Sequence, residues 1–366
     1  MKTVNEVRPL LFKPDMPEAA KRFEAFYNGD IIKRPLTQVF AKKNGCEKSP
    51  VFSSRYTDRY FGDIDELIDK VLASSEGIYY GGEAVPAFCP TLGPDEMAVF
   101  CGGEFIWNPY DADTNWSKPC VDDWESFLPF KIDEKNEAYM RFKSLYERCA
   151  EKMAGKMLLT PIDLHSNMDL LAAARGPERL CADIMDAPEL ISEAMVSARK
   201  IFKEIWDTAA KIGRMDENGY CQGIYSHDGA ACLQCDFAIM IGPKHFNRWV
   251  VPALEEESEI VRHAVYHWDG VDALRHFDAV MDCKGLQVIS FVPGAGAGPR
   301  ETGSHIEFLE IFKKMQKRGK AVAVGGTPDE IKIMHRELDP AKTIYGTSVE
   351  TQDDADQFLE WMEKNT

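Results

Sequence analysis

Several features are missing from this 366-residue sequence, and each absence excludes a class of protein. It contains no run of about 18 apolar residues, so we expect no membrane span. It opens at Met1–Glu6 without an apolar signal region, which leads us to expect a cytoplasmic protein. The formal net charge is −17, and the basic face typical of nucleic-acid-binding proteins is not visible, so we expect no nucleic-acid partner.

The ten cysteines also lack the arrangement of a metal or disulfide framework. Their even count could indicate disulfides, but a large chain without a signal region favours reduced thiols. Cys232 and Cys235 form a CxxC, yet no second CxxC accompanies it, and a single one is a weak signal for a zinc site. We interpret these cysteines as small buried thiols.

The first third of the chain divides into two parts. Residues 1–75 are expected to form a helical N-terminal extension with one strand at Leu36–Phe40. Residues 80–130 are rich in glycine and proline and predict an irregular insertion over one end of the fold. Its expected β-hairpin joins Met97–Phe100 to Glu104–Trp107. The insertion is either a surface loop or a substrate contact, and in the second case Glu83 and Trp116 are candidate substrate-binding residues.

From about residue 135 onward, short apolar strands alternate with amphipathic helices. The expected strands are 156–162, 220–225, 264–267, 286–292, 320–324 and 343–345. Continuous apolar strands of this kind are typical of a parallel sheet covered by helices. With two strands from the first half, the pattern predicts one (β/α)₈ TIM barrel domain over residues 1–366. An open doubly wound sheet is the alternative, but the glycine-rich first turn of that fold is absent.

Polar residues follow three of the predicted strands, at the end where barrel enzymes carry their active sites. They are Asp163, His165, Asp169, His227, Asp228, Asp236, His267 and Asp269. Histidine with carboxylates suits either acid–base catalysis or metal binding, and the sequence does not choose between them. The other histidines fall on predicted helices and are interpreted as structural: His245, His263, His276, His305 and His335. The glycine-rich segment 294–298 could receive a carboxylate or phosphate on its backbone N–H groups.

Four segments of the second half carry a family resemblance. They are Asp169–Gly176 with Asp183–Glu189, Asp236–Phe246, Tyr266–Gly270 and Gly325–Pro328. Together they resemble the uroporphyrinogen-decarboxylase-like superfamily, whose central histidine falls at the position of His267. The resemblance implies a TIM barrel and one of two activities. One group of members decarboxylates uroporphyrinogen, and the other transfers methyl groups between a small substrate, a corrinoid protein and a thiol.

Departures from the family pattern narrow this choice. The arginine-rich N-terminal motif of the decarboxylases is missing from residues 1–60. The zinc-binding His-x-Cys of the thiol-methylating members reads His267-Trp268-Asp269, and no cysteine occurs near Gly346–Ser348. The resemblance therefore implies a methyltransferase that moves a methyl group from a small O- or N-methylated compound to a corrinoid protein. The alternatives are a metal-free decarboxylase of the same fold and a non-catalytic binding protein.

The expected site follows from this reading. His267 and Asp269, with His165 and His227, are the candidate catalytic residues. Asp169, Asp228 and Asp236, with Glu83 and Trp116, are the candidate substrate-binding residues. The cofactor is a corrinoid carried by a partner protein, zinc on His267 is a weaker expectation, and a homodimer is a further one.

Overall fold

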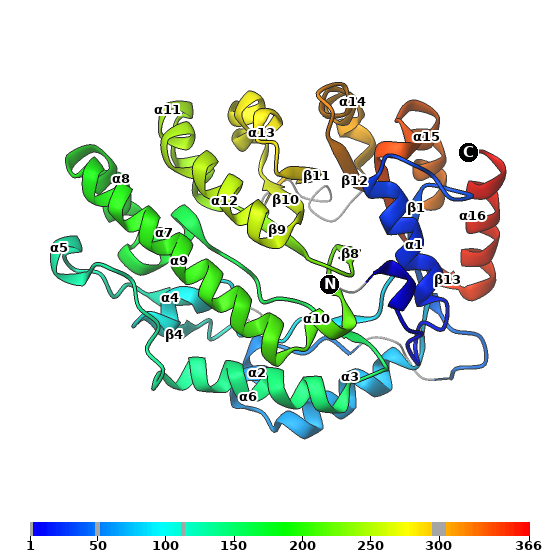
Figure 1. The fold of residues 1–366 in the computed structure, drawn as a ribbon, viewed down its shortest axis with the longest axis horizontal. Coiled ribbons are helices and arrows are strands. Elements are labelled where there is room, and N and C mark those ends of the chain that lie inside the picture. The colour runs from blue at the N-terminus through cyan, green and yellow to red at the C-terminus, as the bar shows by residue number, and fades with distance from the viewer. Residues whose placement is uncertain (1–2, 48–51, 111–113, 295–304) are drawn as a thin grey trace.

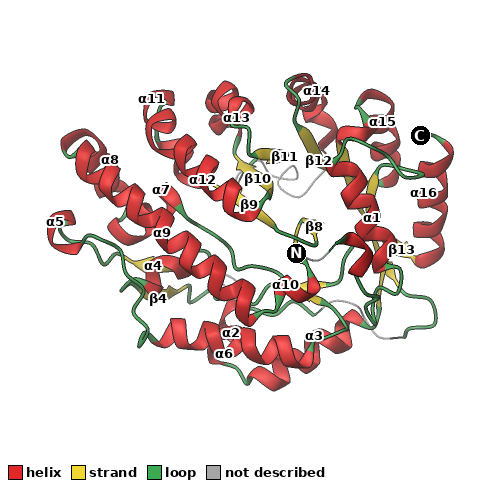
Figure 2. Cartoon of the chain, in the orientation of Figure 1, coloured by secondary structure: helices red, strands yellow, loops and turns green. Residues whose placement is uncertain are grey.

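A central, mostly parallel sheet organises the computed structural model, which describes residues 3–47, 52–110, 114–294 and 305–366. Helices lie around the outside and the strands lie within (Figures 1 and 2). The sheet has seven strands, in the order β2 (Ile78–Gly82), β1 (Leu36–Lys42), β13 (Thr343–Thr351), β12 (Ala321–Gly325), β11 (Leu286–Val292), β10 (His263–Asp269) and β9 (Ala230–Gln234). All its neighbours pair in parallel except β1 and β2, which are antiparallel.

Three short strand pairs complete the β structure. They are β3 (Ala87–Phe88) with β6 (Leu158–Leu159) in parallel, and the antiparallel pairs β4 (Glu104–Trp107) with β5 (Asn115–Lys118) and β7 (Tyr220–Gln222) with β8 (Ile224–Ser226). The sequence predicted strands at 36–40, 264–267, 286–292, 320–324 and 343–345, and the positions of these five sheet strands are confirmed. The predicted strand 156–162 shrinks to two residues.

The helices are α1 (Met16–Tyr27), α2 (Tyr56–Phe61), α3 (Ile64–Ser75), α4 (Glu96–Phe100), α5 (Trp124–Phe127), α6 (Glu137–Lys152), α7 (Asn167–Arg175), α8 (Pro177–Asp186), α9 (Pro188–Ile212), α10 (Met215–Asn218), α11 (Pro243–His245), α12 (Val251–Val261), α13 (Phe277–Asp282), α14 (Leu309–Lys317), α15 (Pro328–Glu337) and α16 (Gln352–Lys364). Their ends follow local chemistry. At α15, the Thr327 side chain accepts from the Glu330 N–H, and the Glu330 carboxylate accepts from the Thr327 N–H. No helix in the described ranges is long and apolar enough to cross a bilayer.

The closed TIM barrel expected from the sequence is not confirmed, because the seven-stranded sheet stays open between β9 and β2 in the part of the chain that the structure describes. Near the β9 edge, hydrogen bonds from a side chain replace the backbone hydrogen bonds that would pair two strands. The Gln222 amide donates to the Ile162 carbonyl at 3.3 Å and accepts from the Cys232 N–H at 2.9 Å. It thereby joins the chain after β6 to β9 without extending the sheet.

The predicted strand 220–225 is wrong in its course. Gly223 has φ of +76°, a conformation that favours glycine, and it reverses the chain between β7 and β8. The sheet strand is instead β9, which begins only at Ala230. An apolar run in a sequence does not reveal that the chain reverses within it, nor in which direction the following strand runs.

The predicted hairpin of the insertion is also corrected. Met97–Phe100 belongs to α4, where each of these four side chains is at most 3% exposed. The hairpin partner of Glu104–Trp107 is β5. Short apolar runs do not distinguish a buried helix from a strand, which explains the error.

Glu83, predicted to contact substrate, instead lies in a buried ion-pair network. Its carboxylate is fully buried and pairs with Arg34 at 2.9 Å and Arg22 at 3.1 Å. It also accepts from the Thr37 N–H at 2.8 Å, on β1. Arg34 extends the network to Glu363 of α16. Glu83 thus joins the first sheet strand to helices from both ends of the chain.

We expect Glu83→Gln to lower the free energy of unfolding by about 3–5 kcal/mol, because it removes the buried carboxylate that pairs with both Arg34 and Arg22, and among the described residues only the partly exposed Glu363 then remains for Arg34. Urea unfolding monitored by circular dichroism measures this. Glu363→Gln is the matched control: its carboxylate is 40% exposed, and its loss should cost about 1 kcal/mol or less. Equal effects of the two variants would contradict the structural role of Glu83.

Candidate active site

The end of β10 presents alternating side chains to the two faces of the sheet. Tyr266 and Trp268 are each 1% exposed, and the Trp268 ring packs on Phe277 of α13. His267 and Asp269 therefore point to the opposite, inner face. In the register, His267 stands beside Gln234 of β9 and Ser290 of β11. The predicted position of His267 and Asp269 at a strand end is confirmed.

Asp163 and His165 form a pair just beyond β6. His165 Nε2 lies 3.4 Å from Asp163 Oδ2, and the Gln234 amide donates to Asp163 Oδ1 at 2.8 Å. Burial alone would raise the pKa of Asp163, but its hydrogen bond with His165 and the charges of His165 and His267 hold it below the ordinary value. Gln234, which sequence reasoning missed, therefore links this pair to the row that contains His267.

His165 is held as a cation. Burial opposes its charge, but the hydrogen bond and charge of Asp163, with the charges of Asp169 and Asp236, raise the pKa of His165 to about 10. Its side chain is 15% exposed. The site therefore holds a proton donor that stays charged at neutral pH.

Asp169 and Asp236 form a pair of neighbouring carboxylates. Asp169, on α7, accepts from the N–H groups of Asp236 at 2.9 Å and Phe237 at 2.8 Å. Burial, followed by the charge of Asp236, raises the pKa of Asp169 to about 7. Oδ1 of Asp236 is buried and has no hydrogen-bond partner among the described residues. Burial and the charge of Asp236 also raise the pKa of Asp269, so the structure brings these three predicted residues together.

Asp95 joins the cluster and was not predicted. It accepts from the Ser117 N–H at 2.9 Å, and burial is the largest influence that raises its pKa. The charges of His165, Asp163 and Asp236 act on it as well. No local signal could have revealed it, because Asp95 precedes the short helix α4 in the glycine- and proline-rich insertion and reaches the site only through the fold.

His227 and Asp228 lie at the other end of the sheet, contrary to prediction. They precede β9, so they stand at its amino end. Asp228 pairs with Arg262, and its Oδ1 lies 3.8 Å from His263 Nε2. His227 Nδ1 lies 3.7 Å from Glu24. The hairpin turn at Gly223 is the physical reason, since it reverses the chain before these residues.

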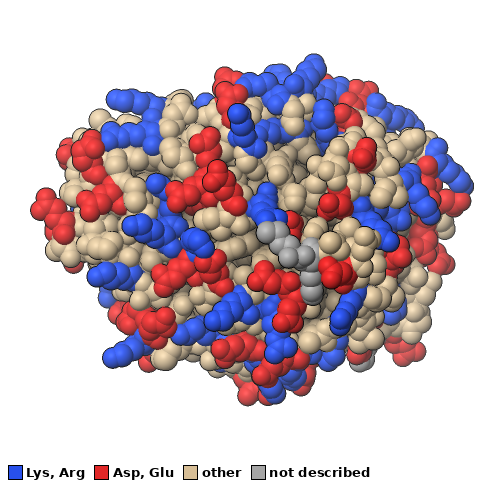
Figure 3. Space-filling model, viewed as in Figure 1, with Lys and Arg blue, Asp and Glu red and all other residues tan. Residues whose placement is uncertain are grey.

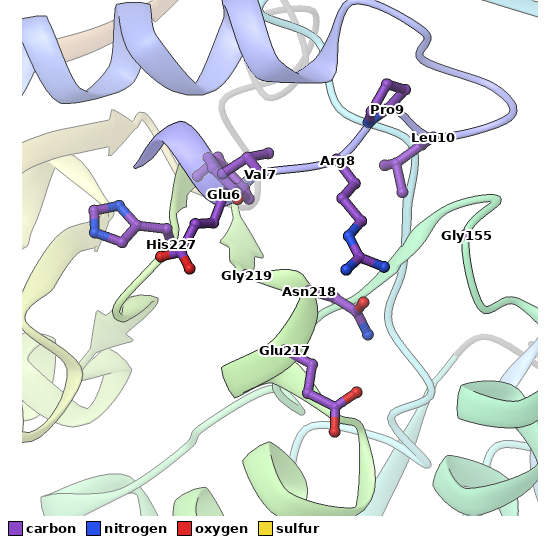
Figure 4. A pocket seen from close by; sticks show the side chains of 11 residues that line it. Glu6, Val7, Arg8, Pro9, Leu10, Gly155, Glu217, Asn218, Gly219 and His227 are labelled. Carbon is purple, nitrogen blue, oxygen red and sulfur yellow. The ribbon is translucent and has the colours of Figure 1, made fainter. Parts of the chain in front are cut away.

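His227 lines a cavity of about 320 Å³ at this amino end. The N-terminal segment Glu6–Leu10 covers it, and Glu217–Gly219 forms the facing wall. In Figure 4, Arg8 extends toward Asn218, while the His227 ring lies on the other side of Glu6. This cavity is separate from the carboxylate cluster.

Acidic and basic residues are interspersed over the face of the molecule seen in Figure 3, so the described residues of this face form no large area of one charge.

Two further predictions gain no support from the geometry. Trp116 is 47% exposed, and it alternates along β5 with the buried Asn115 and Ser117, so it points away from the side that reaches Asp95. Within the described ranges, no three His, Cys, Asp or Glu side chains are grouped as ligands for a metal ion, so the expected zinc on His267 does not fit the residues present. Of the glycine-rich segment 294–298, only Gly294 belongs to the described residues, so the predicted anion site lies outside them.

A second cavity, of about 240 Å³, lies on the inner face of the sheet. Val265 and Ser290 line it, and both share the inner face with His267. The cavity can therefore hold a small molecule on the face of the sheet that also carries His267, whose side chain is suited to proton transfer.

We expect His165 to keep its proton up to about pH 10 and Asp163→Asn to lower the His165 pKa strongly, because burial would then act with much less opposition. Imidazole NMR titration measures both, and His165→Gln assigns the signal. Since the folded pKa lies above the ordinary 6.5, the stabilisation is complete below about pH 6.5 and is lost as the pH rises through about 10. Asp228→Asn, at the other end of the sheet, should leave the titration unchanged. A wild-type midpoint near 6.5 would contradict the pairing.

Comparison with known proteins gives a fold likeness. No family model matches the chain, and no curated protein matches it. The resemblance to the uroporphyrinogen-decarboxylase-like superfamily therefore stays a prediction. Thirteen chains of solved structures do match. One is described as a methyltransferase from Methanosarcina mazei, with a TM-score of 0.57 and 11% sequence identity over 94% of this chain and 98% of that one. At this identity, the likeness shows that the two chains share their overall fold.

Proposed function

We propose that the protein is a methyltransferase that moves a methyl group from a small O- or N-methylated compound to a corrinoid protein. The observation that carries the proposal is the His165–Asp163 pair, 3.4 Å apart and joined through Gln234 to the row that contains His267. The shared fold with a methyltransferase supports it. The function rests on the site, since one fold hosts many activities.

The residues of the site suit the difficult step of demethylation. When a methyl group leaves oxygen or nitrogen, the remaining atom needs a proton or a strong hydrogen bond. His165 can supply it, and His267 with Asp269 can act as a second acid–base pair on the inner face. A reduced corrinoid on a partner protein would supply the nucleophile that receives the methyl group. No zinc-dependent step belongs to the proposal.

The acidic cluster weighs against the decarboxylase alternative. Asp95, Asp163, Asp169, Asp236 and Asp269 act electrostatically within one region. The positive charges that act most strongly on the carboxyl groups of Asp95, Asp163, Asp169 and Asp269 come from His165 and His267. A substrate that carries several carboxylates would be repelled there. A neutral or cationic methylated compound would not.

We expect purified protein, mixed with a reduced corrinoid protein and a panel of methoxylated compounds and methylamines, to produce the absorbance change of methyl-cobalt formation. His267→Ala should slow the reaction by about 10²–10⁴-fold, the usual contribution of general acid–base catalysis. His245→Ala changes a histidine of α11, away from the cluster, and should retain the wild-type rate.

Three results would count against the proposal. The first is no absorbance change across the whole panel. The second is full activity in His267→Ala, which would remove that residue from the mechanism. The third is release of CO₂ from a carboxylated substrate, abolished by the same substitution, which would favour the decarboxylase.

A further inference from the structure

The inner cavity of about 240 Å³ is lined without a single charged side chain among the described residues. Its walls come from β1, β10, β11, β12, β13 and the β7–β8 turn. Three other cavities each contain lysine, arginine or glutamate, such as the one lined by Lys284, Lys320 and Lys342 at the amino ends of β11 and β12. Because burying an unpaired charge is costly, such a lining selects an uncharged occupant.

Small residues create this space and a hairpin limits it. Ala323 and Gly325 of β12 and Gly346 of β13 place almost no side-chain volume on their part of the wall. From the opposite side, the Gly223–Ile224 turn enters, held by a hydrogen bond of 2.9 Å from the Gln38 amide to the Gly223 carbonyl. A Cβ at Gly223 would meet no atom within 4 Å, so the turn borders open space.

His305 is one of three polar side chains that the described residues contribute to the wall, with Gln38 and Ser290. It is the first residue of the 3-10 helix η6 (His305–Phe308), although the sequence predicted a structural histidine on a longer helix. Its Nδ1 accepts a hydrogen bond of 3.0 Å from the Gly325 N–H. A ring nitrogen that accepts carries no proton, so the neutral ring carries its proton on Nε2. Burial lowers the pKa of His305, which favours this neutral form.

The other ring nitrogen is available. No residue in the described ranges forms a hydrogen bond with Nε2 of His305. The ring packs at a tilt against Phe312, at 5.5 Å between centroids, which fixes its plane. The backbone bond and this packing together orient one N–H donor at the wall of an uncharged cavity.

We propose that this cavity binds a small uncharged compound and that Nε2–H of His305 donates a hydrogen bond to its acceptor atom. The binding stands independently of the reaction. One consequence rests on the proposed function: the substrate is then an uncharged O-methyl compound. A methylammonium ion would lose its hydration in a cavity whose described lining offers no opposite charge, which costs free energy. His305 is then a substrate-binding residue that the sequence did not reveal.

Three probes of similar shape test this by calorimetric titration of the full-length protein. Anisole carries an acceptor atom, ethylbenzene lacks it, and benzylammonium carries a charge at neutral pH. We expect anisole to bind saturably and benzylammonium at least tenfold more weakly. His305→Phe should weaken anisole by about two- to tenfold, the usual effect of one hydrogen bond, without weakening ethylbenzene. His305→Gln keeps an N–H donor and should recover part of the loss.

Two further measurements locate the site. The ¹⁵N signal of His305 should report an Nε2–H tautomer in the free protein and shift with anisole but not with ethylbenzene. Ile224→Trp fills the cavity and should abolish binding of both, and thermal unfolding verifies that the variant folds. His245→Phe is the matched control and should bind like the wild type.

The proposal is overturned by equal affinity for the neutral and charged probes, by an Nδ1–H tautomer, or by unchanged anisole binding in His305→Phe. Failure of the proposed function is a separate result. Probe binding that depends on His305, without methyl transfer to a corrinoid protein, would keep the site and reject the methyltransferase. Methyl transfer to a corrinoid protein, with probe binding that does not depend on His305, would keep the methyltransferase and reject the site.

Discussion

The parallel register of β9, β10 and β11 is the constraint on which the site depends. It places Gln234, His267 and Ser290 in one row on the inner face, while Tyr266 and Trp268 turn toward the helices. A shift of one residue would bury His267 under the helices and expose Trp268. The packing of Tyr266 and Trp268 therefore fixes the register, and the register in turn positions the polar cluster.

The parts of the fold that depend on local pattern could be predicted. β10, β11 and β12 are continuous apolar runs between helices with clear ends, and the carboxyl end of β10 predicted His267 and Asp269. Prediction failed where an apolar run had two solutions. Met97–Phe100 forms a buried helix instead of a strand, and 220–225 folds back at Gly223. In α4, burial of every residue removes the periodicity that distinguishes helix from strand, whereas in 220–225 the chain reverses at an exposed glycine inside an otherwise apolar run.

Site residues divide along the same line. His165 and Asp169 follow a strand that the sequence placed nearly correctly, whereas Asp236 follows β9, which was not predicted, and the three meet in the structure. Asp95 and His305 reach their positions through contacts with distant segments, at the Ser117 and Gly325 N–H groups respectively. Such contacts leave no trace in residue spacing. His227 shows the reverse error, because a correct rule about strand ends was applied to a strand whose direction was wrong.

The open edge of the sheet and the size of the inner cavity have a common origin in three consecutive residues. The Gln222 side chain joins the chain after β6 to β9, so a backbone ladder is not needed there. Gly223 then turns the chain inward, where its carbonyl binds Gln38 on the far wall, and Ile224 fills part of the interior. If the backbone at this edge were paired as in a closed barrel, the β7–β8 hairpin would not turn into the interior. The departure from a regular barrel, which made the topology prediction wrong, therefore also keeps the cavity small. It restricts the inner face beside His267 to small ligands.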